Sequence, residues 1–127
     1  MKNVLLALSI VITIVMSSCS KKSNPAPEQD HAIKIIASGT AAFSVIVLTA
    51  PTFGETQTAL KSATIAAGET FEFSTTAASK SYFFVKLSSE LTNNITYKIY
   101  DDGTLSDQEN GKEFGTHSTA TVQYMVK

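Results

Sequence analysis

Four carboxylates lie close together in the segment 101–109. They belong to Asp101, Asp102, Asp107 and Glu109. Because Ca²⁺ prefers several oxygen ligands from a flexible loop, this segment is a candidate calcium site. The spacing departs from the EF-hand loop, which needs acidic or amide residues at positions one, three and five, then glycine at six and glutamate at twelve. We therefore expect a solvated hairpin and loop, with calcium binding as the alternative.

The two histidines of the chain, His31 and His117, offer little further chemistry. A zinc site would need each of them to find nitrogen, sulfur or carboxylate ligands on distant strands. The chain also lacks the Gly-x-Ser-x-Gly motif of a serine hydrolase and has few histidines to act as a base. We expect no metal, no cofactor other than a covalent lipid, no catalytic residue and no enzymatic activity.

Three aromatic residues are candidates for binding a partner. Tyr82, Phe84 and Tyr100 alternate with Phe83 and Ile99, so they project from the opposite face of their strands. An exposed aromatic face suits a glycan or a protein partner. In a two-sheet fold both faces of a central strand can be buried, and core packing is the role that we expect, with binding as the alternative.

The overall charge argues against a nucleic acid partner. Ten Lys and Arg against eleven Asp and Glu give a formal net charge of -1, so no basic excess is available to neutralise phosphates. The 127 residues, 43% hydrophobic and 17% charged, suit one folded domain.

The N-terminus has the layout of a secretory signal peptide, residues 1–18. Lys2 precedes an apolar stretch, 4–16, and small residues follow. As a helix this stretch would span roughly 20 Å, short of the hydrocarbon core of a bilayer. Ser17, Ser18 and Cys19, the one cysteine of the chain, resemble the lipobox of bacterial lipoproteins. The resemblance implies cleavage before Cys19 and a covalent lipid on its thiol, diacylglycerol with palmitate, as a stable membrane anchor.

Residues 19–30 form the predicted tether, a polar segment with two prolines. Ser20 stands where an aspartate would favour the inner membrane in enterobacterial lipoproteins, so the resemblance implies the outer membrane. The start is also similar to lipoproteins of the Bacteroidota. Lys21 and Lys22 occupy the place of the acidic residues that accompany surface display in that group, which favours the periplasmic face, with surface exposure as the alternative.

The folded domain is predicted to span 31–127 and to be all-β. Apolar residues recur with period two, and glycines fall between the runs. The segment 43–48 carries apolar residues on both faces, which predicts a central strand, and Asp102-Gly103 predicts a two-residue type I′ hairpin. We expect a small antiparallel immunoglobulin-like β-sandwich of about six to eight strands, with a partly open barrel as the alternative.

The order of elements is similar to the extracytoplasmic domain of the mycobacterial small membrane proteins that accompany lipid transporters. The resemblance rests on the segments 33–40, 63–73 and 95–103. It implies the same fold. The sequence thus predicts a lipid-anchored cell-envelope protein with a non-enzymatic binding or structural domain and an envelope protein or glycan as partner. The alternatives are an accessory role in envelope transport, or a soluble secreted binding domain if Cys19 is not lipidated.

Overall fold

The computed structural model describes residues 29–127 of the chain. The predicted signal peptide, Ser17, Ser18, Cys19 and the tether up to residue 28 lie outside this range. The described residues form eight antiparallel strands in two four-stranded sheets and contain no helix, so the prediction of an all-β sandwich is confirmed. The immunoglobulin-like assignment stays a prediction.

Each sheet combines strands that are distant in sequence. The first sheet, in spatial order, consists of β4 (Thr70–Ala78), β1 (Asp30–Gly39), β6 (Asn93–Asp101) and β7 (Thr104–Phe114). The second consists of β3 (Thr58–Ile65), β2 (Phe43–Ala50), β5 (Tyr82–Ser89) and β8 (Ser118–Met125). The predicted central strand is β2, which pairs with β3 and β5, and that prediction is confirmed.

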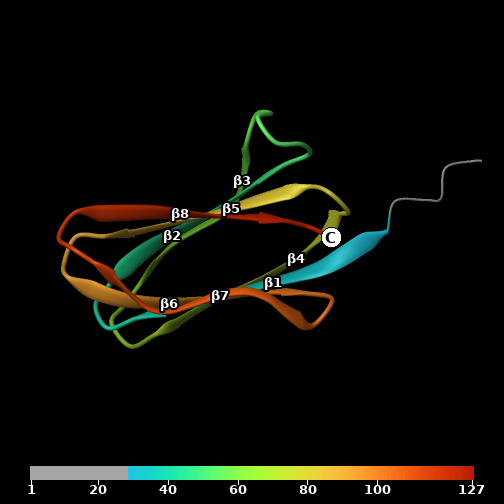
Figure 1. Ribbon diagram of the computed structural model, residues 1–127. Helices are drawn as coiled ribbons and strands as arrows, with labels where there is room; N and C mark the ends of the chain where they lie inside the picture. Colours follow the sequence, from blue (N-terminus) through green and yellow to red (C-terminus); the bar gives the residue numbers. More distant parts are fainter. Residues whose placement is uncertain (1–28) are drawn as a thin grey trace, which may run out of the picture.

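Figure 1 shows the two sheets as stacked layers, with the start of β1 and the C-terminus at the same end. The strand register explains this arrangement. Asp30 pairs with Ala78 in the first sheet, and Tyr82 pairs with Met125 in the second. The amide of Lys80, in the β4–β5 turn, then donates to the carbonyl of Val126 at 2.9 Å. We call this end, which also holds the β2–β3 loop and the β6–β7 turn, the tether end, and the opposite end the far end.

The core lies between the sheets, because alternate residues of each inner strand point inward. A single apolar cluster joins both sheets, and its largest fully buried members include Phe83 and Ile35. The inward residues of the central strands are: Ile33, Ile35, Ala37, Phe43, Val45, Val47, Phe83, Val85, Leu87, Ile95, Tyr97 and Ile99.

Strand β6 differs from the others because polar residues stand at both ends of its buried face. Its inward positions are Asn93, Ile95, Tyr97, Ile99 and Asp101, all of them buried. The Asn93 side chain closes the far end: its oxygen accepts from the Ala41 amide and its nitrogen donates to the Ala41 carbonyl, each at 2.9 Å. Asp101 occupies the corresponding place at the tether end.

The predicted hairpin at Asp102-Gly103 is confirmed. Asp102 has φ 49° and Gly103 has φ 77°, and positive φ at both central residues is the signature of a type I′ turn. The turn connects β6 to β7 and brings both Asp101 and Asp102 to the tether end.

Candidate functional site

The predicted acidic segment is divided by the fold. Asp101 and Asp102 lie at the tether end and meet His31, whereas Asp107 and Glu109 lie along β7. His31 is the second residue of β1, and this strand pairs with β6. Sheet pairing therefore brings a histidine to two of the four candidate carboxylates.

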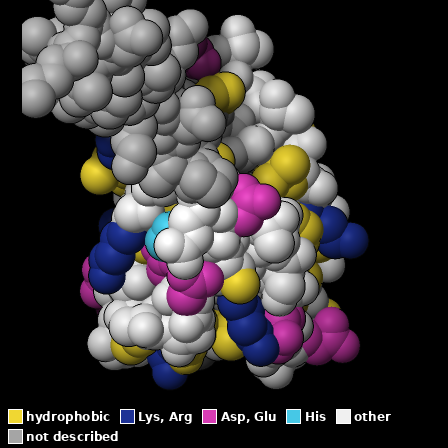
Figure 2. Space-filling view, turned by 90° about the vertical axis from the view of Figure 1, so that its right-hand side faces the viewer, with side chains coloured by type: hydrophobic (Ala, Val, Ile, Leu, Met, Phe, Trp, Pro, Cys, Tyr) yellow, Lys and Arg dark blue, Asp and Glu magenta, His cyan; other side chains and the backbone are white. Residues whose placement is uncertain are grey.

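The His31 ring lies between the two carboxylates. Its Nδ1 is 2.7 Å from Oδ1 of Asp101 and 3.0 Å from Oδ2 of Asp102. Because both neighbours are acceptors, Nδ1 carries a proton and donates. Figure 2 looks onto the tether end and shows a histidine side chain in contact with acidic side chains there. The ring is largely shielded, with 15% of its side-chain surface exposed.

The second oxygen of Asp101 is used as well. Oδ2 accepts from the Tyr124 hydroxyl at 2.6 Å and from the amide of Lys127 at 3.2 Å. Tyr124 belongs to β8 in the other sheet, so Asp101 connects the two sheets at the tether end. We call Asp101, Asp102, His31 and Tyr124 the tether-end cluster.

The ionised form of Asp101 is stabilised by these partners. Burial by itself would raise the pKa of Asp101, since the residue is 5% exposed. The hydrogen bonds from Tyr124, the Lys127 amide and His31, together with the charge of His31, outweigh burial and leave the pKa below its ordinary value. In turn, burial and the neighbouring Asp101 carboxylate raise the pKa of Tyr124 to about 12.

Asp102 completes the cluster through the backbone. Its Oδ1 accepts from the Ala32 amide at 2.8 Å, and its own amide donates to the Ala32 carbonyl at 2.9 Å. The first residues of β1 are thus bound to the β6–β7 turn by both main-chain and side-chain contacts.

The cluster has the donor types of a metal site, but its geometry is that of a hydrogen-bonded network. Suitable atoms of His31, Asp101 and Asp102 lie within 4.8 Å of one another. Three ligands are fewer than the four of a structural zinc site, three of the four carboxylate oxygens already accept a hydrogen bond, and the fourth, Oδ2 of Asp102, lies 3.0 Å from His31 Nδ1. Within residues 29–127, no Ser, Thr or Cys side chain hydrogen-bonds to His31, so a histidine-activated nucleophile is not formed there either. The hydrogen bonds of the tether-end cluster hold the start of β1 in place.

The other two acidic candidates have separate surroundings. Asp107 lies 3.5 Å from the Tyr97 hydroxyl, and Glu109 pairs with Tyr97 across the β6–β7 ladder and is exposed. Burial, followed by the charges of Asp107 and Glu109, raises the pKa of Tyr97 to about 12. His117 lies at the far end, is exposed, and contacts Glu90.

The three candidate aromatic residues lie on outer faces and not in the cluster between the sheets. Tyr82 and Phe84 share the outer face of the second sheet, with ring centroids 6.5 Å apart, and Phe53 from the β2–β3 loop packs on Tyr82 at 5.7 Å. Phe84 is buried on this outer face, whereas Tyr82 is only half-buried. Tyr100 lies on the outer face of the first sheet, so the three do not form one surface.

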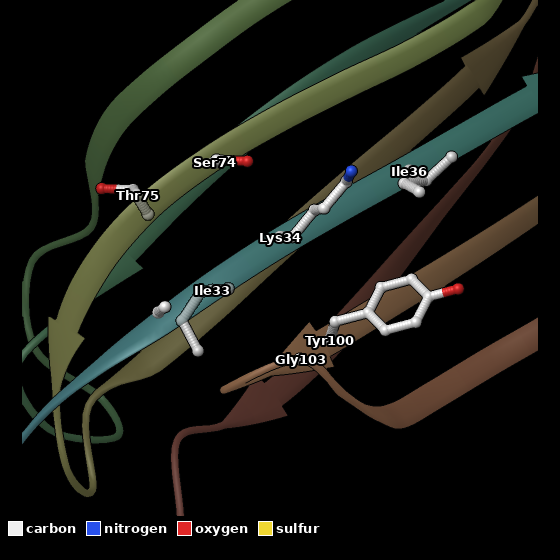
Figure 3. Close-up of a pocket in the computed structure, with 8 residues that line it drawn as sticks. Ile33, Lys34, Ile36, Ser74, Thr75, Tyr100 and Gly103 are labelled. Atoms are coloured by element: carbon white, nitrogen blue, oxygen red, sulfur yellow. The ribbon is translucent and has the colours of Figure 1, made fainter.

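Tyr100 lines an open groove on the first sheet. The groove has a volume of about 470 Å³ and runs over β4, β1 and β6. Figure 3 shows Lys34 and Ile36 of β1 beside Tyr100, with Ser74 of β4 on the other side. The Lys34 ammonium is 2.7 Å from Glu72, so the groove combines an aromatic ring, an apolar side chain and an exposed ion pair.

The sequence analysis did not predict the burial of Asn93 and Asp101, although the alternation of residues in β6 indicates it. The inward series that includes Ile95 and Ile99 extends by two residues at each end to Asn93 and Asp101, and both are buried. The period alone would have placed them inward. The partners of Asp101, His31 and Tyr124, come from strands whose pairing could not be read from the sequence.

Comparison of the chain with protein-family models, curated proteins and solved structures gives no match. Within residues 29–127 the structure has no helix long and apolar enough to cross a membrane.

Proposed function

We propose that the protein is a lipid-anchored component of a bacterial cell envelope, and that its β-sandwich is a non-enzymatic binding or structural domain. The anchor is a covalent lipid on Cys19, after cleavage of the signal peptide before Cys19, where Ser17 and Ser18 are the preceding small residues. The proposal rests first on the apolar N-terminal stretch followed by small residues and a lone cysteine.

The way in which the chain enters the domain supports this proposal. The chain enters through β1, an inner strand of the first sheet with neighbours on both sides. The tether-end cluster binds the first residues of β1, and the Ser79 amide donates to the Gln29 carbonyl at 3.3 Å. A domain held to a membrane by its N-terminus needs such a firm connection, and this is the structural observation that favours the proposal most.

The groove on the first sheet is the surface that we propose for a partner. A half-buried tyrosine ring that lines an open groove next to a Lys34–Glu72 ion pair suits a glycan, through stacking and hydrogen bonds, or a polar protein segment. Crosslinking in intact cells identifies the partner, and Tyr100→Ala is expected to weaken its capture. Loss of capture with Tyr82→Ala instead would place the partner on the second sheet.

Metabolic labelling with a lipid analogue tests the anchor. We expect label on the natural chain and none on Cys19→Ala, together with protection of the domain from protease until the outer membrane is breached. Absence of label with release into the medium would favour a soluble secreted binding domain. Capture of transporter subunits by crosslinking would favour the accessory role in envelope transport.

A further inference from the structure

Exposed large apolar side chains are unevenly distributed over the domain. Six are found among residues 29–127: Ile46, Phe53, Leu60, Leu91, Leu105 and Met125. Four of these six lie close to the tether end, in the β2–β3 loop, at the start of β3, at the start of β7 and at the last residue of β8. Leu91, in the β5–β6 turn, is the only one of the six at the far end.

Phe53 is the most exposed of these residues, at 66%, and Met125 is 50% exposed. The β2–β3 loop projects from the second sheet in Figure 1, on the side where Tyr82 lies. Within the loop, Gly54 has φ 88° and the Glu55 amide donates to the Thr52 carbonyl, which forms a tight turn around Phe53. The turn leaves most of the Phe53 ring in contact with solvent, and an exposed apolar surface of this kind is typical of an interaction site.

Phe53, Tyr82 and Met125 form one surface. The Phe53 ring packs on Tyr82 at 5.7 Å between centroids, and Tyr82 pairs with Met125 across the β5–β8 ladder. We call these three residues the Phe53 patch. Charged residues of both signs, Glu55, Lys80 and Lys127, are exposed at the same end, so net charge does not select the partner.

The length of chain before β1 limits what lies opposite the patch. Eleven residue steps separate Cys19 from Asp30. As a coil they would span about 18 Å on average, and fully extended at most about 40 Å. A lipid on Cys19 therefore keeps the tether end close to the bilayer surface, at about 18 Å on average and within about 40 Å at full extension.

We propose that the tether end docks on the lipid surface that carries the anchor, with Phe53 inserted among the acyl chains and Tyr82 and Met125 at the level of the headgroups. This inference rests on the proposed lipid anchor. Aromatic and apolar side chains on a projecting loop suit the interface between headgroups and acyl chains. The Phe53 patch lies on the outer face of the second sheet, whereas the groove proposed for a partner lies on the first sheet.

The absence of tryptophan from the chain allows a direct test. Phe53→Trp and Leu91→Trp each introduce a single fluorophore, at the tether end and at the far end. The two sites are matched in exposure, at 66% and 60%. The lipidated mature protein is bound to phosphatidylcholine vesicles with and without brominated acyl chains. We expect Phe53→Trp to shift its emission to the blue and to lose most of it to bromine quenching, while Leu91→Trp keeps its emission.

Flotation with the vesicles separates the two proposals. If the protein floats and neither tryptophan is quenched, the anchor holds but docking is refuted. Equal quenching at both positions would also refute it, because the domain would then have no preferred orientation. Failure to float would remove the anchor and the docking together. If Phe53→Ser abolishes crosslinks to an envelope protein while quenching is absent, the patch binds protein and the lipid proposal is overturned.

Discussion

Replacement of Asp101 tests whether the tether-end cluster holds the domain together. In Asp101→Ala, the Tyr124 hydroxyl and the Lys127 amide lose their acceptor, and His31 keeps only Asp102, in a place that is 5% exposed. Breaking a buried charged pair by removing one partner costs about 3 to 5 kcal/mol. For a domain of this size the whole stability is on the order of 5 to 15 kcal/mol, so we expect Asp101→Ala to lower Tm by at least about 12 °C.

Asp101→Asn separates the loss of charge from the loss of shape. Its amide oxygen can accept from Tyr124, and its NH2 group can donate to Nδ1 of a neutral His31. The Tyr124 hydroxyl and the His31 ring then keep a partner at this position while Oδ2 of Asp102 loses its donor, and the expected cost is about 1 to 2 kcal/mol. Tyr124→Phe removes one hydrogen bond of 2.6 Å and should cost a similar amount.

The pH dependence of the same variants has a defined sign. Because the pKa of Asp101 is below its ordinary value in the folded protein, its contribution is present above the pKa of the unfolded chain. The contribution is lost as pH falls through the lower, folded value. The natural protein should therefore lose stability in acid more steeply than Asp101→Asn does.

Urea unfolding of each variant, followed by circular dichroism from acid to neutral pH, measures these differences. Asp30→Asn serves as the control, since Asp30 is an exposed carboxylate on the same strand as His31. Its change should stay within about 0.5 kcal/mol. A loss below about 1 kcal/mol for Asp101→Ala, or equal acid sensitivity of the natural protein and Asp101→Asn, would refute the account of the cluster.

The remaining predictions concern the tyrosines and the far end. In an ultraviolet titration, Tyr97 and Tyr124 should ionise near pH 12. Tyr97→Phe and Tyr124→Phe should each remove one equivalent from that step. Ionisation of both tyrosines near pH 10 would contradict their burial. Because these pKa values are raised, their stabilisation is present below pH 10 and lost as pH approaches 12, which alkaline unfolding would detect. Gly39→Ala should lower the free energy of unfolding in urea by about 1 to 3 kcal/mol, because its Cβ would lie 2.9 Å from both Asn93 Oδ1 and the Phe43 ring. An unchanged urea midpoint would contradict this prediction and show that both neighbours can move.

The fold class could be predicted from the sequence because local signals agree. Alternation of apolar residues located the strands with buried faces, and Asp102-Gly103 located one hairpin. Strands β3 and β7 are largely exposed, and their alternation is correspondingly faint. Sheet membership could not be predicted, since it depends on packing between segments that are distant in sequence.

The candidate site was predicted only in part. The carboxylates of Asp101 and Asp102 were identified as candidates, but their partner is a histidine 70 residues earlier in the chain. Such a contact is fixed by the β1–β6 pairing and leaves no mark at the level of local sequence. The exposed Phe53 was also missed, because a lone apolar residue in a turn has no period to reveal it.

Lipid labelling of Cys19 tests the central claim most directly. The natural protein and Cys19→Ala are expressed with a clickable fatty acid, and the membrane fraction is analysed by mass spectrometry. A lipid on Cys19 of a chain that begins at that residue, absent from the Cys19→Ala protein, is the predicted result. An intact N-terminus with an unmodified thiol would contradict the account.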